Sequence, residues 1–198
     1  MVKTSPFTNN MTNTHFIESI GVINAFAKNT SLIAQIDRII EKIVSTYKQD
    51  GKVLIFGNGG SAADAQHFAG ELVSRFYFDR PALSAFALTT DTSVLTAIGN
   101  DYGYEQVFSR QVSASAKAGD VVIAISTSGN SKNVLAALAV AKTKGSFTVG
   151  LTGHTGGAMK EVCDVCICVP SDSTPRIQEC HLIIEHAICA GVESALFG

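Results

Sequence analysis

Residues 53–61 read VLIFGNGGS, and residues 121–131 read VVIAISTSGNS. Each stretch starts with an apolar run of strand length, continues into a loop of glycine, asparagine and serine, and precedes a helical pattern. The free N–H groups of a helix N-terminus attract anions, and small side chains let a ligand come close to them. Two loops of this kind predict a ligand with a phosphate and several hydroxyl groups, such as a sugar phosphate.

The same alternation of apolar runs and helical patterns continues to the end of the chain. Strands are expected at 52–56, 82–89, 120–126, 147–152 and 165–169, and helices at 61–77, 91–99, 104–118, 131–144, 156–162 and about 175–196. Near-continuous apolar strands separated by helices predict a parallel sheet that is buried on both faces. We therefore expect a three-layer, flavodoxin-like α/β fold with a five-stranded, mainly parallel sheet. Its ligands should bind beyond the carboxyl ends of the strands, where both loops lie.

A pair of helices is expected before the first strand, over residues 11–50. Apolar residues recur at helical spacing, first at Phe16, Ile20, Ile23 and Phe26, then at Ile33, Ile36, Ile40, Ile43 and Tyr47. Thr30 or Ser31 could cap the second helix, and Asp50-Gly51 would end it. We expect one domain over residues 1–198, made of this pair and an α/β core from residue 52.

Composition excludes several classes of protein. The 198 residues include 15 Lys and Arg against 17 Asp and Glu, a net charge of −2, which argues against a nucleic-acid surface. The mean hydropathy of +0.24 is high, but no apolar run approaches the roughly 20 residues of a membrane span. The surplus apolar surface is therefore expected to cover the two-sided sheet or to form subunit contacts.

Features of the termini and the cysteines favour the cytoplasm. Residues 1–10 are polar and unlike a signal peptide. The five cysteines are odd in number, which argues against a disulfide framework. Cys163 and Cys166 match C-x-x-C, but no second pair at zinc-finger spacing accompanies them, so we interpret them as small buried hydrophobic residues.

The first loop formally matches a dinucleotide-binding fingerprint at Gly57, Gly59 and Ala62. That motif needs an acidic residue at the end of the next strand. Here the nearest acid after that strand, Asp91, comes too late. A sugar phosphate is therefore favoured over a nucleotide.

Polar side chains lie on two of the expected helices. His67 and Glu71 are four residues apart and share one helix face, which Arg75 would continue. This pattern fits a metal or acid–base site, but taken alone it fits a solvated helix face better. The mostly apolar last helix carries Gln178 and His186, eight residues and about 12 Å apart along the axis. One small centre would need both side chains to reach toward it, or one of them to come from a neighbouring subunit.

In this order, the motifs closely resemble the bacterial sedoheptulose 7-phosphate isomerases (phosphoheptose isomerases) of the sugar isomerase (SIS) superfamily. The resemblance is carried by GNGGSAADAQHFAGEL at 57–72, GNDYG at 99–103, STSGNS at 126–131, and RIQE at 176–179 with His186. It covers about residues 14–196. It implies conversion of sedoheptulose 7-phosphate to D-glycero-D-manno-heptose 7-phosphate through an enediol. This reaction begins ADP-heptose synthesis for the lipopolysaccharide inner core.

The resemblance also implies roles for individual residues. Ser126, Thr127, Ser128 and Ser131 would hold the phosphate. The sugar would be lined by Asn58, Gly59, Gly60, Ser61, Asn100 and Asp101, with Glu71 and Gln178 also beside it. A zinc ion would be held by His67, Glu71, Gln178 and His186. Glu71 and His186 would form the acid–base pair, and no organic cofactor is needed for a redox-neutral reaction.

The family is homotetrameric with sites at subunit interfaces, so the resemblance implies a homo-oligomer here. The competing interpretation is a non-catalytic SIS-fold protein that binds sugar phosphates or associates with the bacterial replication initiator. That group lacks the catalytic carboxylate and the second histidine, and this chain has Glu71 and His186. An amino-sugar phosphate isomerase or an SIS-type regulator is a further alternative, but such proteins usually carry the domain twice or fused to another. His15 and His154 are expected to be dispensable, since His154 lies in a glycine-rich stretch typical of a surface turn.

Overall fold

The computed structural model describes residues 9–198, with side chains from residue 11 onward; most of the polar N-terminal segment lies outside the described residues. The helices and strands are α1 (Asn9–Ala27), α2 (Thr30–Tyr47), β1 (Val53–Gly57), α3 (Gly60–Val73), β2 (Ala85–Ala87), α4 (Thr92–Tyr102), the 3-10 helix η1 (Tyr104–Gln106), α5 (Ser109–Ser115), β3 (Val121–Ile125), α6 (Lys132–Thr143), β4 (Phe147–Thr152), α7 (Met159–Val162), β5 (Val165–Cys168) and α8 (Thr174–Phe197).

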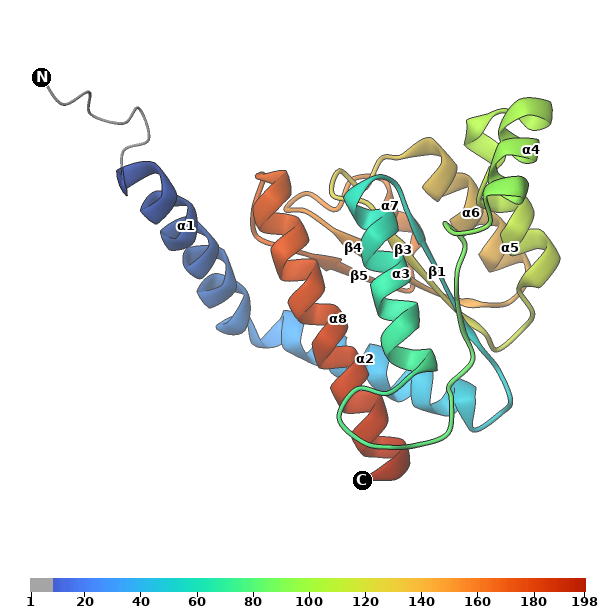
Figure 1. Ribbon diagram of the computed structural model, residues 1–198, viewed down its shortest axis with the longest axis horizontal. Helices are drawn as coiled ribbons and strands as arrows, with labels where there is room; N and C mark the ends of the chain where they lie inside the picture. Colours follow the sequence, from blue (N-terminus) through green and yellow to red (C-terminus); the bar gives the residue numbers. More distant parts are fainter. Residues whose placement is uncertain (1–8) are drawn as a thin grey trace, which may run out of the picture.

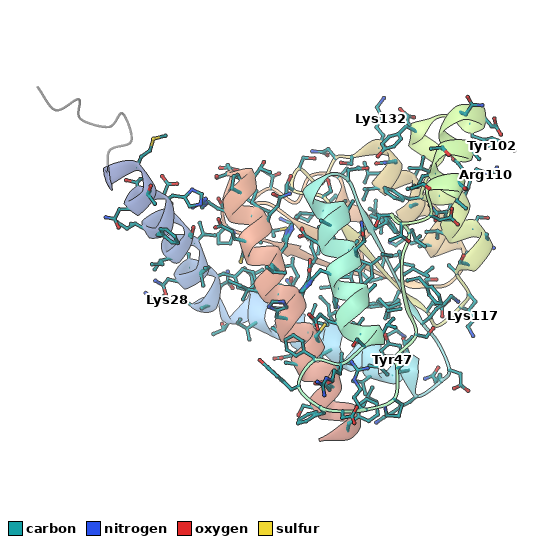
Figure 2. All side chains as sticks on the ribbon, in the orientation of Figure 1. Lys28, Tyr47, Tyr102, Arg110, Lys117 and Lys132 are labelled. Carbon is teal, nitrogen blue, oxygen red and sulfur yellow. The ribbon has the colours of Figure 1, made fainter. Side chains whose placement is uncertain are left out.

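The five strands form one sheet in the order β2-β1-β3-β4-β5, and every neighbouring pair is parallel. The predicted architecture is confirmed. β1 and β3 lie side by side in the sheet, with Gly57 opposite Ile125. The two glycine- and serine-rich loops therefore leave the same edge of the sheet next to each other. In Figure 2, Lys132, just after the second loop, lies at the top of the view, and Lys117, before β3, lies lower, at the right side of the molecule.

The side chains of successive strand residues point to opposite faces of the sheet and pack into two separate hydrophobic layers. Ile55 and Ile123 point into a layer closed by α2, α3 and α8. Leu54 and Val122 point into a second layer closed by α4, α5, α6 and α7. In Figure 1 the sheet lies between these two groups of helices. The three-layer order positions α3 and α8 on the same side of the sheet, which brings the polar residues of the two helices together.

α1 projects from the body of the molecule (Figure 1). Its contact with the rest of the chain includes Arg176 of α8, whose guanidinium donates to the backbone oxygen of His15 and to the hydroxyl of Ser19. α8 itself is long and apolar enough to cross a membrane by length and composition. Here it packs as a core helix against α1, α2 and α3.

Several element boundaries differ from the sequence-based prediction. The expected helix 61–77 ends at Val73, so Arg75 does not continue the face of His67 and Glu71. The expected helix 104–118 is split into η1 and α5. The expected strand 82–89 contains only β2, because this edge strand pairs with β1 over a register of three residues.

Local backbone geometry explains further differences. Helix 156–162 is reduced to α7, because Gly156 and Gly157 have positive φ angles of 75° and 51°, which no α-helix accommodates. α2 is capped by Asn29, not by Thr30 or Ser31: its side-chain oxygen accepts from two backbone N–H groups of the first turn. That helix ends at Tyr47, before the predicted stop at Asp50 and Gly51.

The burial of α2 and of the cysteines also departs in part from expectation. Leu32 and Ile39 are buried on α2, while Ile33 of the predicted stripe is 39% exposed. The five cysteines all lie in the described part of the chain and are free. Cys163, which follows α7, and Cys166, on the edge strand β5, are half-buried and not fully buried.

Candidate active site

The first loop turns at Gly59, which caps the N-terminus of α3 with a φ of 58°. A positive φ of this kind favours glycine. The neighbouring Gly60 has a different role, because a Cβ at this position would lie 2.2 Å from Nε2 of Gln178. The absence of a side chain therefore allows the Gln178 amide to lie against the start of α3.

Asn58 joins the two loops. Its side-chain amide exchanges two hydrogen bonds of 2.9 Å with the amide of Asn133, in the first turn of α6. The hydroxyl of Tyr104 also donates to Asn58 Oδ1, over 3.1 Å. Sequence reasoning missed Asn133 and Tyr104. The pairing of β1 with β3 brings Asn133 to this loop, and the packing of η1 against α4 and α6 brings Tyr104 there.

The second loop concentrates hydroxyl groups at the N-terminus of α6. The side-chain oxygen of Ser126 lies 3.0 Å from that of Ser131 and 3.4 Å from that of Ser128. Ser131 occupies the N-cap position of α6, but its hydroxyl makes no capping bond. Donor groups and the positive end of a helix dipole thus face the same space, an arrangement that suits an anion.

A cleft of about 270 Å³ adjoins this loop. Thr127 and Ser128 line it on one side, and His154 and Asp172 line it on the other. His154 is exposed, with Nδ1 3.8 Å from Oδ1 of Asp172. The loop that carries His154 therefore borders the serine loop.

Three titratable side chains converge between α3 and α8. Nε2 of His67 lies 2.8 Å from Nε2 of His186 and 3.6 Å from Oε1 of Glu71. One ligand atom from each of these residues lies within 4.8 Å of the others. The ring of Phe76 packs against His186 with a centroid separation of 5.5 Å. The cluster contains two imidazole rings and a half-buried carboxylate, the side-chain groups typical of an acid–base or metal centre.

Two further carboxyl groups, those of Asp64 and Glu185, lie on the helices α3 and α8 that carry this cluster. Glu185, next to His186, is fully buried, and neither of its side-chain oxygens has a hydrogen-bond partner in the described chain. Burial and, secondarily, the charge of Asp64 raise its pKa to about 9, so Glu185 holds a proton at neutral pH. Burial also raises the pKa of Asp64.

The remaining predicted residues lie apart from the three-residue cluster. Gln178 contacts the start of α3 at Gly60, seven residues and about 10 Å along the helix from His67. Asn100 donates to Asp101 over 2.8 Å at the end of α4. In the described chain neither Asn100 nor Asp101 has a hydrogen bond to any other predicted site residue.

Comparison with known proteins agrees with this geometry. The SIS domain family matches residues 15–153. A phosphoheptose isomerase from Campylobacter jejuni is 59% identical over 184 residues, covering 93% of this chain and 92% of that protein. A phosphoheptose isomerase from Aneurinibacillus thermoaerophilus is 57% identical over 189 residues, covering 96% of each. The chain belongs to the phosphoheptose isomerases of the SIS family.

A solved relative extends the match to three dimensions. The phosphoheptose isomerase from Neisseria gonorrhoeae superimposes with a TM-score of 0.88 at 45% identity, over 93% of this chain and 98% of that one. The predicted family and the predicted isomerase class are therefore confirmed. The alternative of a non-catalytic SIS-fold protein loses its support, because the similar relatives are named as isomerases across nearly the whole chain.

Proposed function

We propose that this phosphoheptose isomerase converts sedoheptulose 7-phosphate to D-glycero-D-manno-heptose 7-phosphate, the first step of ADP-heptose synthesis for the lipopolysaccharide core. The observation that carries the proposal is the cluster of His67, Glu71 and His186 on the side of the sheet where α3 follows the first glycine-rich loop. The names of the highly similar relatives support the same substrate class.

The reaction moves hydrogen between two neighbouring carbons, and Glu71 and His186 are suited to it. Glu71 would remove the proton from C1 while His186 protonates the C2 oxygen, which gives an enediol. Loss of the proton from the C1 hydroxyl and return of a proton to C2 then yield the aldehyde. General acid–base groups contribute about 10²–10⁴-fold each to such steps.

The two loops would bind the rest of the substrate. Ser126, Thr127, Ser128 and Ser131 would donate to the phosphate, supported by the N-terminus of α6. The sugar hydroxyl groups would contact the side chains or backbone of Asn58, Gly59, Gly60, Ser61, Asn100, Asp101 and Gln178. Because the hydroxyl donors are uncharged, they provide hydrogen bonds without a fixed positive charge.

The three-residue cluster also fits a zinc ion. The ligand atoms of His67, Glu71 and His186 lie within 4.8 Å of one another, and imidazole nitrogens and carboxylate oxygens are common zinc ligands. We propose His67, Glu71 and His186 as ligands. Gln178 lies about 10 Å along α3 from His67 in the same chain, so we propose that a fourth ligand, Gln178, would come from a neighbouring subunit. When bound, the ion would polarise the substrate oxygens as a Lewis acid. We propose no organic cofactor, because the reaction is redox-neutral.

We also propose a single SIS domain over residues 1–198 that assembles as a homotetramer in the cytoplasm. The exposed apolar side chains of α1 support assembly: Phe16, Ile17 and Ile20 are 62%, 59% and 56% exposed. An apolar face of this kind on a projecting helix is typical of a subunit contact. Neither nucleic acid nor membrane is proposed as a partner.

A turnover assay in deuterium oxide tests the proposed reaction. Sedoheptulose 7-phosphate is incubated with the protein, and the product is followed by NMR. An enediol mechanism is expected to incorporate solvent deuterium at C2 of the heptose. Parallel assays with an aldopentose phosphate and an amino-sugar phosphate test the substrate class. Turnover of either one without turnover of sedoheptulose 7-phosphate would reject the proposal.

A further inference from the structure

The segment between α3 and β2 links the two helices that carry the cluster. In Figure 1 this segment, drawn in green, leaves α3 and passes beside α8 near its C-terminal end before it rises to β2. The carboxylate of Glu193, on α8, is fully buried and accepts hydrogen bonds from backbone N–H groups of this segment. The donors are Phe76 at 2.9 Å, Tyr77 at 2.5 Å and Phe78 at 3.1 Å.

Arg80 forms the other half of the contact. Its side chain is 2% exposed, and its Nε donates to Oε1 of Glu193 over 2.9 Å. The rest of the guanidinium caps the end of α3. It donates to the backbone oxygens of Glu71 at 2.9 Å, Leu72 at 2.7 Å, Ser74 at 3.2 Å and Pro81 at 3.2 Å. The planar fork of arginine allows these bonds to be made together, which the single ammonium of a lysine cannot do.

The hydrogen bonds to Glu193 favour its ionised form. Burial alone would raise its pKa, but the hydrogen bonds from the three backbone N–H groups and from Arg80 lower the pKa to about 2. The Glu193 carboxylate therefore carries its charge at neutral pH, opposite the Arg80 guanidinium.

Both ends of this contact lead to the acid–base pair. Arg80 binds the backbone oxygen of Glu71 itself. Glu193 binds the N–H group of Phe76, whose ring packs against His186. The buried Arg80–Glu193 pair thus holds the backbone of Glu71 and the residue whose ring packs against His186.

We infer that Arg80 and Glu193 are positioning residues of the isomerase, which hold Glu71 and His186 at their reacting distance through the end of α3 and the ring of Phe76. This inference rests on the roles proposed above for Glu71 and His186. It differs from a purely structural role, because a buried ion pair that only stabilises the fold would affect the amount of folded protein and not the rate of each folded molecule.

The test compares Arg80→Lys and Phe76→Leu with the wild type. Arg80→Lys keeps the charge opposite Glu193 but loses the simultaneous bonds to Glu71 and Leu72. Phe76→Leu keeps an apolar side chain and leaves the backbone bond to Glu193 in place. Displacement of catalytic groups by about 1 Å can lower the rate about 10²-fold. We expect kcat to fall about tenfold or more in both variants, with KM changed less than about threefold, because the serine loop is untouched.

The matched control is Arg38→Lys, an exposed arginine of α2 whose guanidinium lies over the ring of Phe147. It should retain wild-type kcat and KM. The pH dependence of kcat/KM is measured in parallel, since displacement of Glu71 or His186 shifts the limbs of the profile and a change of stability alone does not.

Two results would overturn the inference. One is a folded Arg80→Lys protein with wild-type kcat and pH profile. The second result concerns the case in which circular dichroism shows that Arg80→Lys does not fold. The Phe76→Leu variant is then decisive, and a wild-type kcat and pH profile in Phe76→Leu reject the inference. Glu71→Gln is assayed beside them. If it keeps wild-type turnover, the proposed role of Glu71 fails, whatever the Arg80 and Phe76 variants show.

Discussion

Nε2 of His67 and Nε2 of His186 lie 2.8 Å apart, although 119 residues separate them in the sequence. At this distance the two rings can share one hydrogen bond, donated by whichever nitrogen carries the proton. Ring nitrogens beside the Glu71 carboxylate can also hold a metal ion or carry a proton between substrate oxygens. The contact exists only because α3 and α8 cover the same face of the sheet.

Replacement of Glu71 by Gln should abolish most turnover. The substitution keeps the shape of the side chain and removes the base, so we expect kcat to fall by about 10²–10⁴-fold. Circular dichroism and equilibrium binding of sedoheptulose 7-phosphate should stay close to wild type. Wild-type kcat in this variant would contradict the assignment.

Removal of the hydroxyl groups at Ser126 and Ser128 should raise KM more than it lowers kcat. Groups that bind the phosphate equally in ground and transition states contribute uniform binding, and its loss appears in KM. Steady-state kinetics of the double alanine variant check this, with Ser115→Ala on the exposed end of α5 as control. An unchanged KM would mean that the phosphate binds elsewhere.

His154→Ala should retain kcat, as should His15→Ala. His154 is exposed and reaches Asp172 at 3.8 Å, and His15, in the first half of α1, contacts Arg176 at the start of α8. Neither touches the cluster of His67, Glu71 and His186. The comparison is with His186→Ala, which should be inactive. Equal losses of kcat in His154→Ala and His186→Ala would show that the site has been misplaced.

Subunit mixing should reveal whether a site draws on more than one chain. Both residues belong to α8. Gln178 contacts Gly60 at the start of α3, whereas His186 contacts His67, farther along α3. Inactive Gln178→Ala and His186→Ala proteins are combined under conditions of subunit exchange. Regained activity is expected if the two residues of one site come from different chains. A lack of recovery after verified exchange assigns both residues to one chain, and a monomer in sedimentation analysis rejects assembly altogether.

Stability should fall as the pH drops from 6.5 to 4, because of His181. This ring is fully buried, and burial lowers its pKa from 6.5 to about 4, against the hydrogen bond to Thr152. Between pH 6.5 and 4 the unfolded chain therefore binds a proton at this ring that the folded chain does not bind. This lowers the free energy of unfolding by about 3 kcal/mol in total. Denaturant titrations of His181→Gln at several pH values should lose this step. An identical pH dependence in that variant would assign the step to other groups.

Much of the architecture was predictable from local pattern. The apolar runs at residues 53–56 and 121–125 form fully buried strands, because side chains on both faces of a parallel sheet are covered. The loops after them turn where Gly59 and Gly129 adopt positive φ angles. Boundaries were predicted less well where a distant group intervenes. α3 ends at Val73, where the guanidinium of Arg80 donates to the backbone oxygen of Leu72. No periodicity in the sequence predicts that hydrogen bond.

The sequence by itself determined the alternation of strands and helices, the two glycine- and serine-rich loops and the residue types of the candidate site, because these depend on spacing within short segments. Only the tertiary structure decided which of those residues meet. It joined His67 and Glu71 to His186, held Gln178 against Gly60, and brought Asn133 and Tyr104 to Asn58. These contacts depend on strand order and helix packing, which join segments far apart in the chain and leave no local pattern in the sequence.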